Sequence, residues 1–325
     1  MRRVRYHEYG DPDVLTLEEV DQPSPGPAQV LIKAEAIGTN FVDTRYRRGP
    51  ASGAIFRRPL PGKLTGDVVG TVEAVGADVD GYQVGQRVAA LAAEDAYADF
   101  VLADAQWIAA VPEGLDVGAA SMLPMGAPVA LRALRSGGLT AGETVLVHSA
   151  AGGIGHLIVR LAKELGAGTV IATAGSPAKL DFARKCGADA GIDYTEPDWP
   201  DHVRTIAPGG VDVVVEAVGG ETLLRSFDTL APYGRVVSYG AASGELAAVP
   251  ITALFRLRSV VGFNITAWRT AFPEQARAEM TELAGLFAAG RLQTTVHATL
   301  PLTEAAEAHR ILEDRSQMGR VLLLP

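Results

Sequence analysis

The stretch TVLVHSAAGGIG, residues 144–155, decides the fold of this chain. Its apolar run, residues 145–147, is typical of a parallel strand that is buried on both faces. Glycines follow at once, and Ile158 and Leu161 then recur at helical spacing before Gly166, which is placed to end a helix. A strand, a glycine turn and a helix predict the first half of a dinucleotide-binding unit.

The glycine turn predicts a phosphate site. Glycine lets the backbone approach a pyrophosphate, and the first N–H groups of the following helix favour an anion. Ala150 stands where the common GxGxxG motif has its first glycine, so an ordinary tight turn is the alternative. The strand and the helix on either side favour the cofactor site. Its candidate binding residues are Ala151, Gly152, Gly153 and Ile154.

The chain divides into a β-rich part and a part in which strands and helices alternate. Strands are expected at 144–149, 169–174, 190–193, 211–216, 235–239 and 259–263, with helices between them up to 165 and at 177–186, 199–206 and 221–230. This alternation predicts an α/β fold with a doubly wound parallel sheet. Residues 1–110 have short strands between glycines, which suggests a small barrel. We expect a first domain at 1–121, completed by 267–325, and a second domain at 122–266.

Composition excludes several classes of protein. The 325 residues carry a formal net charge of −9, which argues against a nucleic-acid partner. Cys186 is the single cysteine, so an intrachain disulfide is excluded. The N-terminal segment has no apolar core of a signal peptide, and no apolar run has the length of a membrane span. The expected location is the cytoplasm.

Several motifs together carry a resemblance to a known family. They are NFVD at 40–43, LTGDVVGTVEAVG at 64–76, VGQRVA at 84–89, HSAAGGIG at 148–155 and GRVVSYGAASG at 234–244. With these motifs the chain resembles the zinc-free, ζ-crystallin-like quinone oxidoreductases of the medium-chain dehydrogenase/reductase superfamily. The resemblance implies a GroES-like β-barrel catalytic domain and a Rossmann domain, with a nicotinamide bound between them.

The resemblance also predicts that no metal is bound. The first zinc ligand of the related alcohol dehydrogenases, a cysteine, aligns with Asn40, and their histidine ligand aligns with Gly66. The histidines of this chain are scattered, whereas a zinc site needs three or four converging ligands. Without a Lewis acid the expected acceptor is conjugated, because a quinone or an enone can spread the developing charge itself.

The second strand indicates which nicotinamide is bound. An NAD site places an acidic residue about 20 residues beyond the glycines, on the ribose 2′-OH. Here the strand ends in Gly175 and Ser176 without an acid, and Ser176 is a favourable helix N-cap. Gly175, Lys179 and Tyr194 match positions where NADPH-dependent members hold the 2′-phosphate. We therefore expect NADPH; the alternative is a capped surface helix with a solvated lysine.

The remaining candidates rest on the resemblance. Asn40, Asp43, Arg45 and Tyr46 are the catalytic candidates, and Asn40 is also a cofactor contact. Asp43 has an alternative role in a structural turn. Tyr46 has an alternative role in packing near a strand end. Further cofactor contacts are expected at Val218, Tyr239, Gly240, Phe263 and Asn264. For Phe263 and Asn264 the alternative is a role in an edge strand at a dimer interface. The strand expected at 259–263 is apolar and lies at the sheet edge, which predicts a homodimer.

These observations predict an NADPH-dependent reductase that transfers hydride to a small quinone or α,β-unsaturated carbonyl. One alternative is an enoyl reductase that acts on a carrier-bound or polyketide intermediate. The other is an NADPH-binding protein without catalysis. Arg45, Arg47, Arg48, Arg57 and Arg58 crowd into one segment, which suggests an anionic substrate. A solvated loop is the alternative for that segment.

Overall fold

The computed structural model describes residues 1–325, except for the side chain of residue 54, and it divides the chain into two compact units. The first unit comprises Met1–Met125, Met280–Gly290 and Thr294–Pro325. The second comprises Gly126–Glu279 and Arg291–Gln293. Residues 122–125 thus cluster with the first unit, and residues 267–279 and 291–293 with the second, unlike the limits expected from the sequence.

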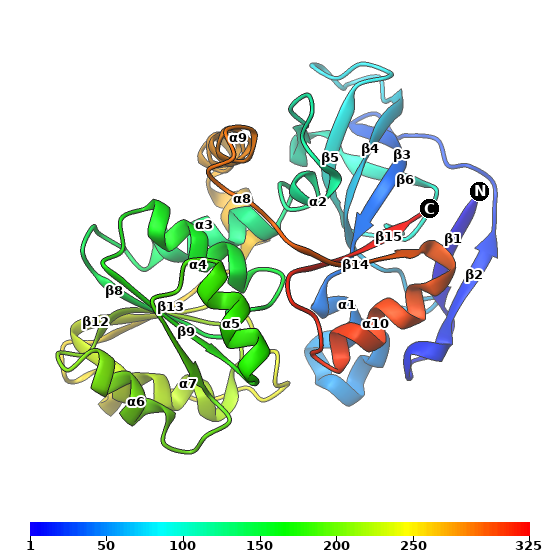
Figure 1. The fold of residues 1–325 in the computed structure, drawn as a ribbon. Coiled ribbons are helices and arrows are strands. Elements are labelled where there is room, and N and C mark those ends of the chain that lie inside the picture. Colours follow the sequence, from blue (N-terminus) through cyan, green and yellow to red (C-terminus); the bar gives the residue numbers. More distant parts are fainter. The chain divides into compact units, whose positions relative to one another are not determined.

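The second unit is a doubly wound parallel sheet with its helices, as the sequence predicted (Figure 1). Its six strands run in the order β10-β9-β8-β11-β12-β13, and every neighbouring pair is parallel. The strands are β8 (Thr144–Val147), β9 (Thr169–Ala174), β10 (Ala190–Asp193), β11 (Val211–Glu216), β12 (Leu230–Ser238) and β13 (Ser259–Gly262). The helices are α3 (Gly126–Ser136), α4 (Gly155–Glu164), α5 (Pro177–Lys185), α6 (Trp199–Ile206), α7 (Gly220–Ser226) and α8 (Ile265–Ala271).

The strand order reverses between β8 and β11. The chain moves outward from β8 through β9 to β10, and then crosses back to start again at β11. In open parallel sheets such a switch point leaves a crevice at the carboxyl ends of the two central strands, where ligands bind. The carboxyl end of β8 leads into the glycine turn, so the fold places the motif at this point.

Both faces of this sheet are covered by helices. Leu146, Ile171 and Val214 belong to a buried cluster with Trp199 of α6 and Leu223 of α7. Figure 1 shows α4 and α5 on the opposite side of the sheet. Burial on both faces explains why these strands are continuously apolar in sequence.

The helix limits follow local signals in most places. Gly166 ends α4 with a φ of +88°, and its N–H donates to the Lys163 carbonyl. Pro177 opens α5, where a missing N–H costs nothing. The helix expected at 221–230 is shorter than predicted: α7 ends at Ser226, and Leu230 already pairs with Val211 in the sheet. Here strand pairing overrides the helical pattern.

The first unit is rich in strands. One sheet has the order β14-β15-β3-β4-β5-β7, with β6 paired to β3, and β1 pairs with β2. The strands are β1 (Arg2–Tyr6), β2 (Leu15–Glu19), β3 (Gln29–Gly38), β4 (Gly66–Val75), β5 (Arg87–Ala92), β6 (Phe100–Asp104), β7 (Ile108–Ala110), β14 (Val296–Pro301) and β15 (Arg320–Leu324). The helices are α1 (Phe41–Arg48), α2 (Val117–Ala120) and α10 (Ala305–Glu313), and α9 (Pro273–Ala288) has residues in both units.

The C-terminal segment completes the first sheet, in line with the expectation that it completes the first domain. Leu322 and Leu323 of β15 pair with Gly38 and Ile37 of β3 in antiparallel register. The helix α1 was not foreseen, because residues 1–110 were expected to form strands and turns. It lies beside α10 from the other end of the chain (Figure 1). Among the described residues, no helix combines the length and apolar character that a membrane crossing needs.

Candidate active site

The turn after β8 is held tightly by its own backbone. The Gly152 N–H donates to the Ser149 carbonyl at 3.0 Å, and Ser149 itself has a φ of +51°. A Cβ on Gly155 would lie 2.1 Å from the Ser149 oxygen, so only glycine fits there. Ala151 is buried, while Gly152, Gly153 and Ile154 are half-buried at the start of α4. The turn therefore offers backbone to a ligand, as a phosphate site requires.

His148, at the end of β8, is part of the scaffold. Its ring lies between the Thr173 and Ser226 hydroxyls, at 2.8 and 2.9 Å, and it meets the Trp199 ring edge-on. Complete burial lowers the pKa of His148 to about 3, so the ring is neutral at physiological pH. His148 therefore supports the strand end.

The end of β9 brings three of the candidates together. Tyr194 follows β10, and its hydroxyl lies 3.8 Å from the position that a Cβ of Gly175 would take. Ser176 occupies the N-cap position of α5, but its hydroxyl makes no capping hydrogen bond. Lys179 is half-buried in the first turn of the same helix. No acidic residue follows the strand at this point, so the charge pattern is the one expected for a phosphate.

The ends of β11 and β12 adjoin in the sheet and carry further candidates. A Cβ on Gly240 would lie 3.3 Å from the Ala217 carbonyl, so the two strand ends are in close contact. Val218 is buried and Tyr239 is half-buried. Burial and the neighbouring Glu216 raise the pKa of the Tyr239 hydroxyl, which stays protonated.

Phe263 and Asn264 lie at the sheet edge, immediately after β13. The Phe263 N–H donates to the Ser238 carbonyl at 2.9 Å, which extends the pairing with β12. The Asn264 side-chain oxygen accepts from the Ala267 N–H at 2.9 Å and caps α8. The cap explains this asparagine locally.

A buried polar cluster in the first unit contains Asn40. Arg320, at the start of β15, forms an ion pair with Asp67 and donates from Nη1 to the Asn40 side-chain oxygen at 2.9 Å. All three side chains are buried. Gly38 leaves room for this arrangement, because a Cβ there would lie 1.8 Å from Arg320 Nη2. Sequence reasoning missed Arg320 and Asp67; a charged residue beside the apolar run of β15 was the available signal.

Asp43, on α1 of the same unit, is fully buried. Its carboxylate accepts from the Thr65 N–H at 2.8 Å and from the Thr65 hydroxyl at 3.0 Å. Burial raises the pKa of Asp43 to about 7, although the Thr65 hydrogen bonds oppose the rise. The geometry agrees with the alternative role in a structural turn, because the carboxylate connects α1 to the segment before β4.

Arg45 and Tyr46 lie on α1, so the expectation of a tyrosine near a strand end is wrong. The Arg45 guanidinium lies 5.0 Å from the centre of the Phe41 ring, and Tyr46 packs against Phe56 and beneath the Arg58 guanidinium. Burial lowers the pKa of Arg45, and the nearby positive charges of Arg315 and Arg48 lower it further.

The arginine segment is a solvated loop only in part. Arg47 is fully buried and forms an ion pair with Glu313 of α10, and Arg48 binds the same carboxylate at 2.8 Å. These two arginines join α1 to α10. Arg45 is half-buried, and Arg57 and Arg58 are exposed.

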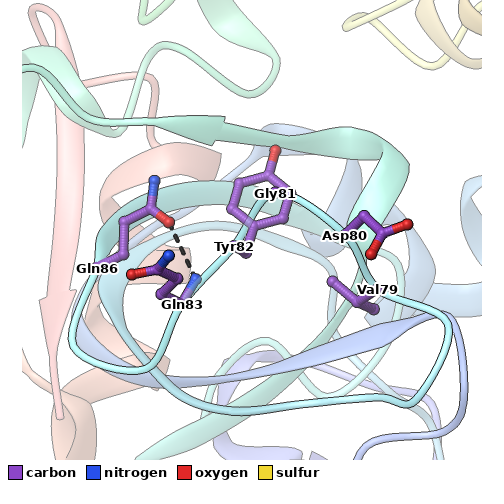
Figure 2. Close-up of a pocket in the computed structure, with 6 residues that line it drawn as sticks. All are labelled: Val79, Asp80, Gly81, Tyr82, Gln83 and Gln86. Atoms are coloured by element: carbon purple, nitrogen blue, oxygen red, sulfur yellow. Dashed lines mark hydrogen bonds between the residues drawn. The ribbon is translucent and has the colours of Figure 1, made fainter.

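One hollow of about 520 Å³ lies elsewhere, in the loop between β4 and β5. Figure 2 shows its lining, where the Gln83 N–H donates to the Gln86 side-chain oxygen and the Tyr82 ring stands between them and Asp80. The lining residues are Val79, Asp80, Gly81, Tyr82, Gln83 and Gln86, and none of them is a candidate from the sequence. Throughout the described residues, no three His, Cys, Asp or Glu side chains gather in a metal-binding group.

Comparisons with known proteins match the whole chain. The alcohol dehydrogenase GroES-like domain model matches residues 26–113, and the zinc-binding dehydrogenase model matches residues 153–282. A quinone oxidoreductase of Pseudomonas aeruginosa is 36% identical, over 100% of this chain and 99% of that protein. A 2-haloacrylate reductase of a Burkholderia species is 37% identical, over 98% of this chain and 97% of that protein.

The solved structures agree with the relatives. A mycobacterial protein solved in complex with NADPH superposes with a TM-score of 0.92 at 35% identity, and the match covers 100% of both chains. Matches of this extent reach both compact units and include every candidate residue. The chain belongs to the quinone oxidoreductase branch of the medium-chain dehydrogenase/reductase superfamily.

Proposed function

We propose that this protein is an NADPH-dependent reductase that passes hydride to a small quinone or an α,β-unsaturated carbonyl without a metal. The observation that carries the proposal is the glycine turn at the switch point of a six-stranded parallel sheet, beside a strand end with Lys179 and no acid. The relatives named quinone oxidoreductase and 2-haloacrylate reductase, and the neighbour that binds NADPH, support it.

The residues fit this cofactor. Residues 151–154 would receive the pyrophosphate, because Gly152, Gly153 and Ile154 are partly exposed at the start of α4. Gly175, Ser176, Lys179 and Tyr194 would hold the 2′-phosphate. The Ser176 hydroxyl is not engaged in capping, and the Lys179 ammonium offers a point charge. Val218, Tyr239, Gly240, Phe263 and Asn264 would border the nicotinamide from the carboxyl ends of the strands.

Bound NADPH would supply the hydride, and the acceptor would take one proton as well, so that NADPH, a proton and a quinone give NADP⁺ and a hydroquinone. In the first unit, Asn40 would contact the cofactor and the acceptor with its amide. Asp43 would act by holding α1 in place, since its carboxylate is committed to Thr65. The side chains of Arg45 and Tyr46 would face the substrate.

The matching test is NADPH oxidation with a panel of quinones and enones, with and without exhaustive chelation. We expect turnover that chelation leaves unchanged, because Asn40 and Gly66 occupy the positions of metal ligands in zinc-dependent relatives. Loss of activity on chelation, restored by zinc, would contradict the metal-free mechanism. Tight NADPH binding without turnover on any acceptor would favour the non-catalytic alternative.

A second candidate function is the reduction of an unsaturated carboxylate or of a carrier-bound enoyl group. Arg45 supports it, because burial and the nearby cations Arg315 and Arg48 lower the pKa of this half-buried guanidinium. A 2-haloacrylate is an anionic enone analogue, and a relative at 37% identity bears its name. A positive potential near the substrate would attract such an acceptor.

We further infer a cytoplasmic homodimer. The support is β13, an edge strand whose outer side has no partner within the described chain. Val260 on this strand is 38% exposed, and Ile251, Phe255 and Leu257 just before it are more exposed still. Apolar edge strands favour pairing with a second copy about a two-fold axis.

A further inference from the structure

Glu216 is a buried carboxylate at the end of a central strand. The proposed chemistry does not use this side chain. It is the last residue of β11, and its side chain has no exposed surface. Its Oε1 accepts from the Val218 N–H and from the Gly219 N–H, the latter at 2.8 Å. One carboxylate oxygen therefore organises the backbone of the two residues that follow the strand.

The same turn is tied to the segment after β12. The Ala242 N–H donates to the Ala217 carbonyl and the Ser243 N–H to the Val218 carbonyl, both at 2.8 Å. The Gly220 N–H donates to the backbone carbonyl of Glu245 at 3.1 Å. Gly219 has a φ of +80°, and a Cβ there would lie 2.8 Å from the Glu245 carbonyl. Backbone hydrogen bonds therefore hold the turn on one side, and the carboxylate of Glu216 holds it on its buried side.

The charge on this carboxylate is responsive to pH. Burial raises the pKa of Glu216 to about 7, while hydrogen bonds from Gly219, Val218 and Ser238 favour its charged form. Around it, Tyr239, which follows β12, stays protonated, and His148, which follows β8, stays neutral. Glu245, whose carbonyl meets the turn, is exposed. Among these neighbours no cation compensates the carboxylate.

We propose that Glu216 is a positioning residue that holds the turn of residues 217–219 in the shape that receives the nicotinamide half of the cofactor. The proposal rests on the proposed function, which places Val218 beside the nicotinamide. Charged hydrogen bonds to the two N–H groups keep this backbone rigid, and rigidity lowers the cost of binding. The adenosine half of the cofactor binds at the ends of β8 and β9 and does not depend on this turn.

The test compares two ligands on the purified full chain by fluorescence or calorimetric titration. NADPH contains the nicotinamide, and adenosine 2′,5′-bisphosphate lacks it. In Glu216→Ala we expect about tenfold weaker binding of NADPH, since two N–H groups lose a charged acceptor, and unchanged binding of the bisphosphate. Glu221→Gln is the matched control: it removes a carboxylate on the exposed first turn of α7, and both affinities should remain as in the wild type.

Glu216→Gln provides a second, milder test, because the amide oxygen still accepts but carries no charge. It mimics the protonated carboxyl, so its affinity for NADPH should equal that of the wild type well below pH 7 and fall below it above pH 8. The proposal would be overturned if Glu216→Ala weakened the binding of both ligands equally. It would also be overturned if the difference in NADPH affinity between Glu216→Gln and the wild type were constant with pH. Failure of the wild type to bind NADPH would instead refute the proposed function.

Discussion

Arg320 fixes the side-chain amide of Asn40. Its Nη1 donates to the Asn40 oxygen at 2.9 Å and also to the Thr39 carbonyl, while its Nη2 is paired with Asp67. Because the oxygen of Asn40 is committed to a guanidinium, the orientation of the amide is determined, and its Nδ2 is left as a buried donor without a partner in the structure. The residues that set this orientation are 280 positions apart in the chain.

Replacing Arg320 by Met should therefore destabilise the protein strongly. The change leaves the Asp67 carboxylate buried without its counter-charge, which typically costs about 3–5 kcal/mol. Urea unfolding followed by circular dichroism measures the loss. Arg291→Met is the control, since Arg291 forms a mostly exposed ion pair with Glu164 and should cost little. A loss below about 1 kcal/mol for Arg320→Met would mean that the buried pair contributes nothing net.

Asp43 should make stability fall as the pH rises toward neutrality. Its pKa is raised from 3.8 to about 7 by burial, so the folded state holds a proton that the unfolded chain releases near pH 4. The stabilisation is complete below about pH 4 and is lost between pH 4 and pH 7. In Asp43→Asn this contribution to the pH dependence should vanish. Unfolding free energies of both proteins at several pH values test this, and identical pH profiles would contradict the assignment.

Lys179 should distinguish the two nicotinamide cofactors. Lys179→Ala should raise the KM for NADPH about tenfold and leave that for NADH nearly unchanged, because only NADPH has the 2′-phosphate that an ammonium can bind. Lys185→Ala, an exposed lysine at the end of the same helix, is the matched control. Equal losses with both cofactors would show that Lys179 supports the helix rather than the phosphate.

Arg45 tests the charge of the acceptor. Arg45→Ala should lower kcat/KM for carboxylated quinones or enones and spare neutral ones, and added salt should weaken the wild-type preference. Arg57→Ala removes an exposed arginine from the same segment and should leave the preference intact. If Arg45→Ala treats anionic and neutral acceptors as the wild type does, the second candidate function loses its support.

Val260 tests the dimer. Val260→Lys puts a charge on the outer edge strand β13, and charged edges resist pairing with another chain. Light scattering at micromolar concentration should find a dimer for the wild type and a monomer for the variant. Leu17→Lys is the control, because Leu17 on β2 has a similar exposure, 43% against 38% for Val260. A monomeric wild type would refute the predicted assembly.

The sequence determined most of the strands of the parallel sheet. The predicted limits of β9, β10 and β11 agree with the structure residue for residue, because glycine or other turn residues bound each short segment. The glycine turn at 152–155 could be read in the same way, and close backbone contact at Gly155 leaves no room there for another residue. In this part of the chain the secondary structure is determined locally, by residues that are close together in the sequence.

Only the tertiary structure decided the polar interior of the first unit. The helix α1 has no clear apolar stripe, because Asp43 and Arg47 occupy its buried face. They are tolerated there because Thr65 and Glu313, 22 and 266 residues away, supply their partners. Arg320 meets Asp67 and Asn40 across a similar span. A buried charge is stable only beside its partner, and such a partner is brought near by the fold rather than by the sequence around it.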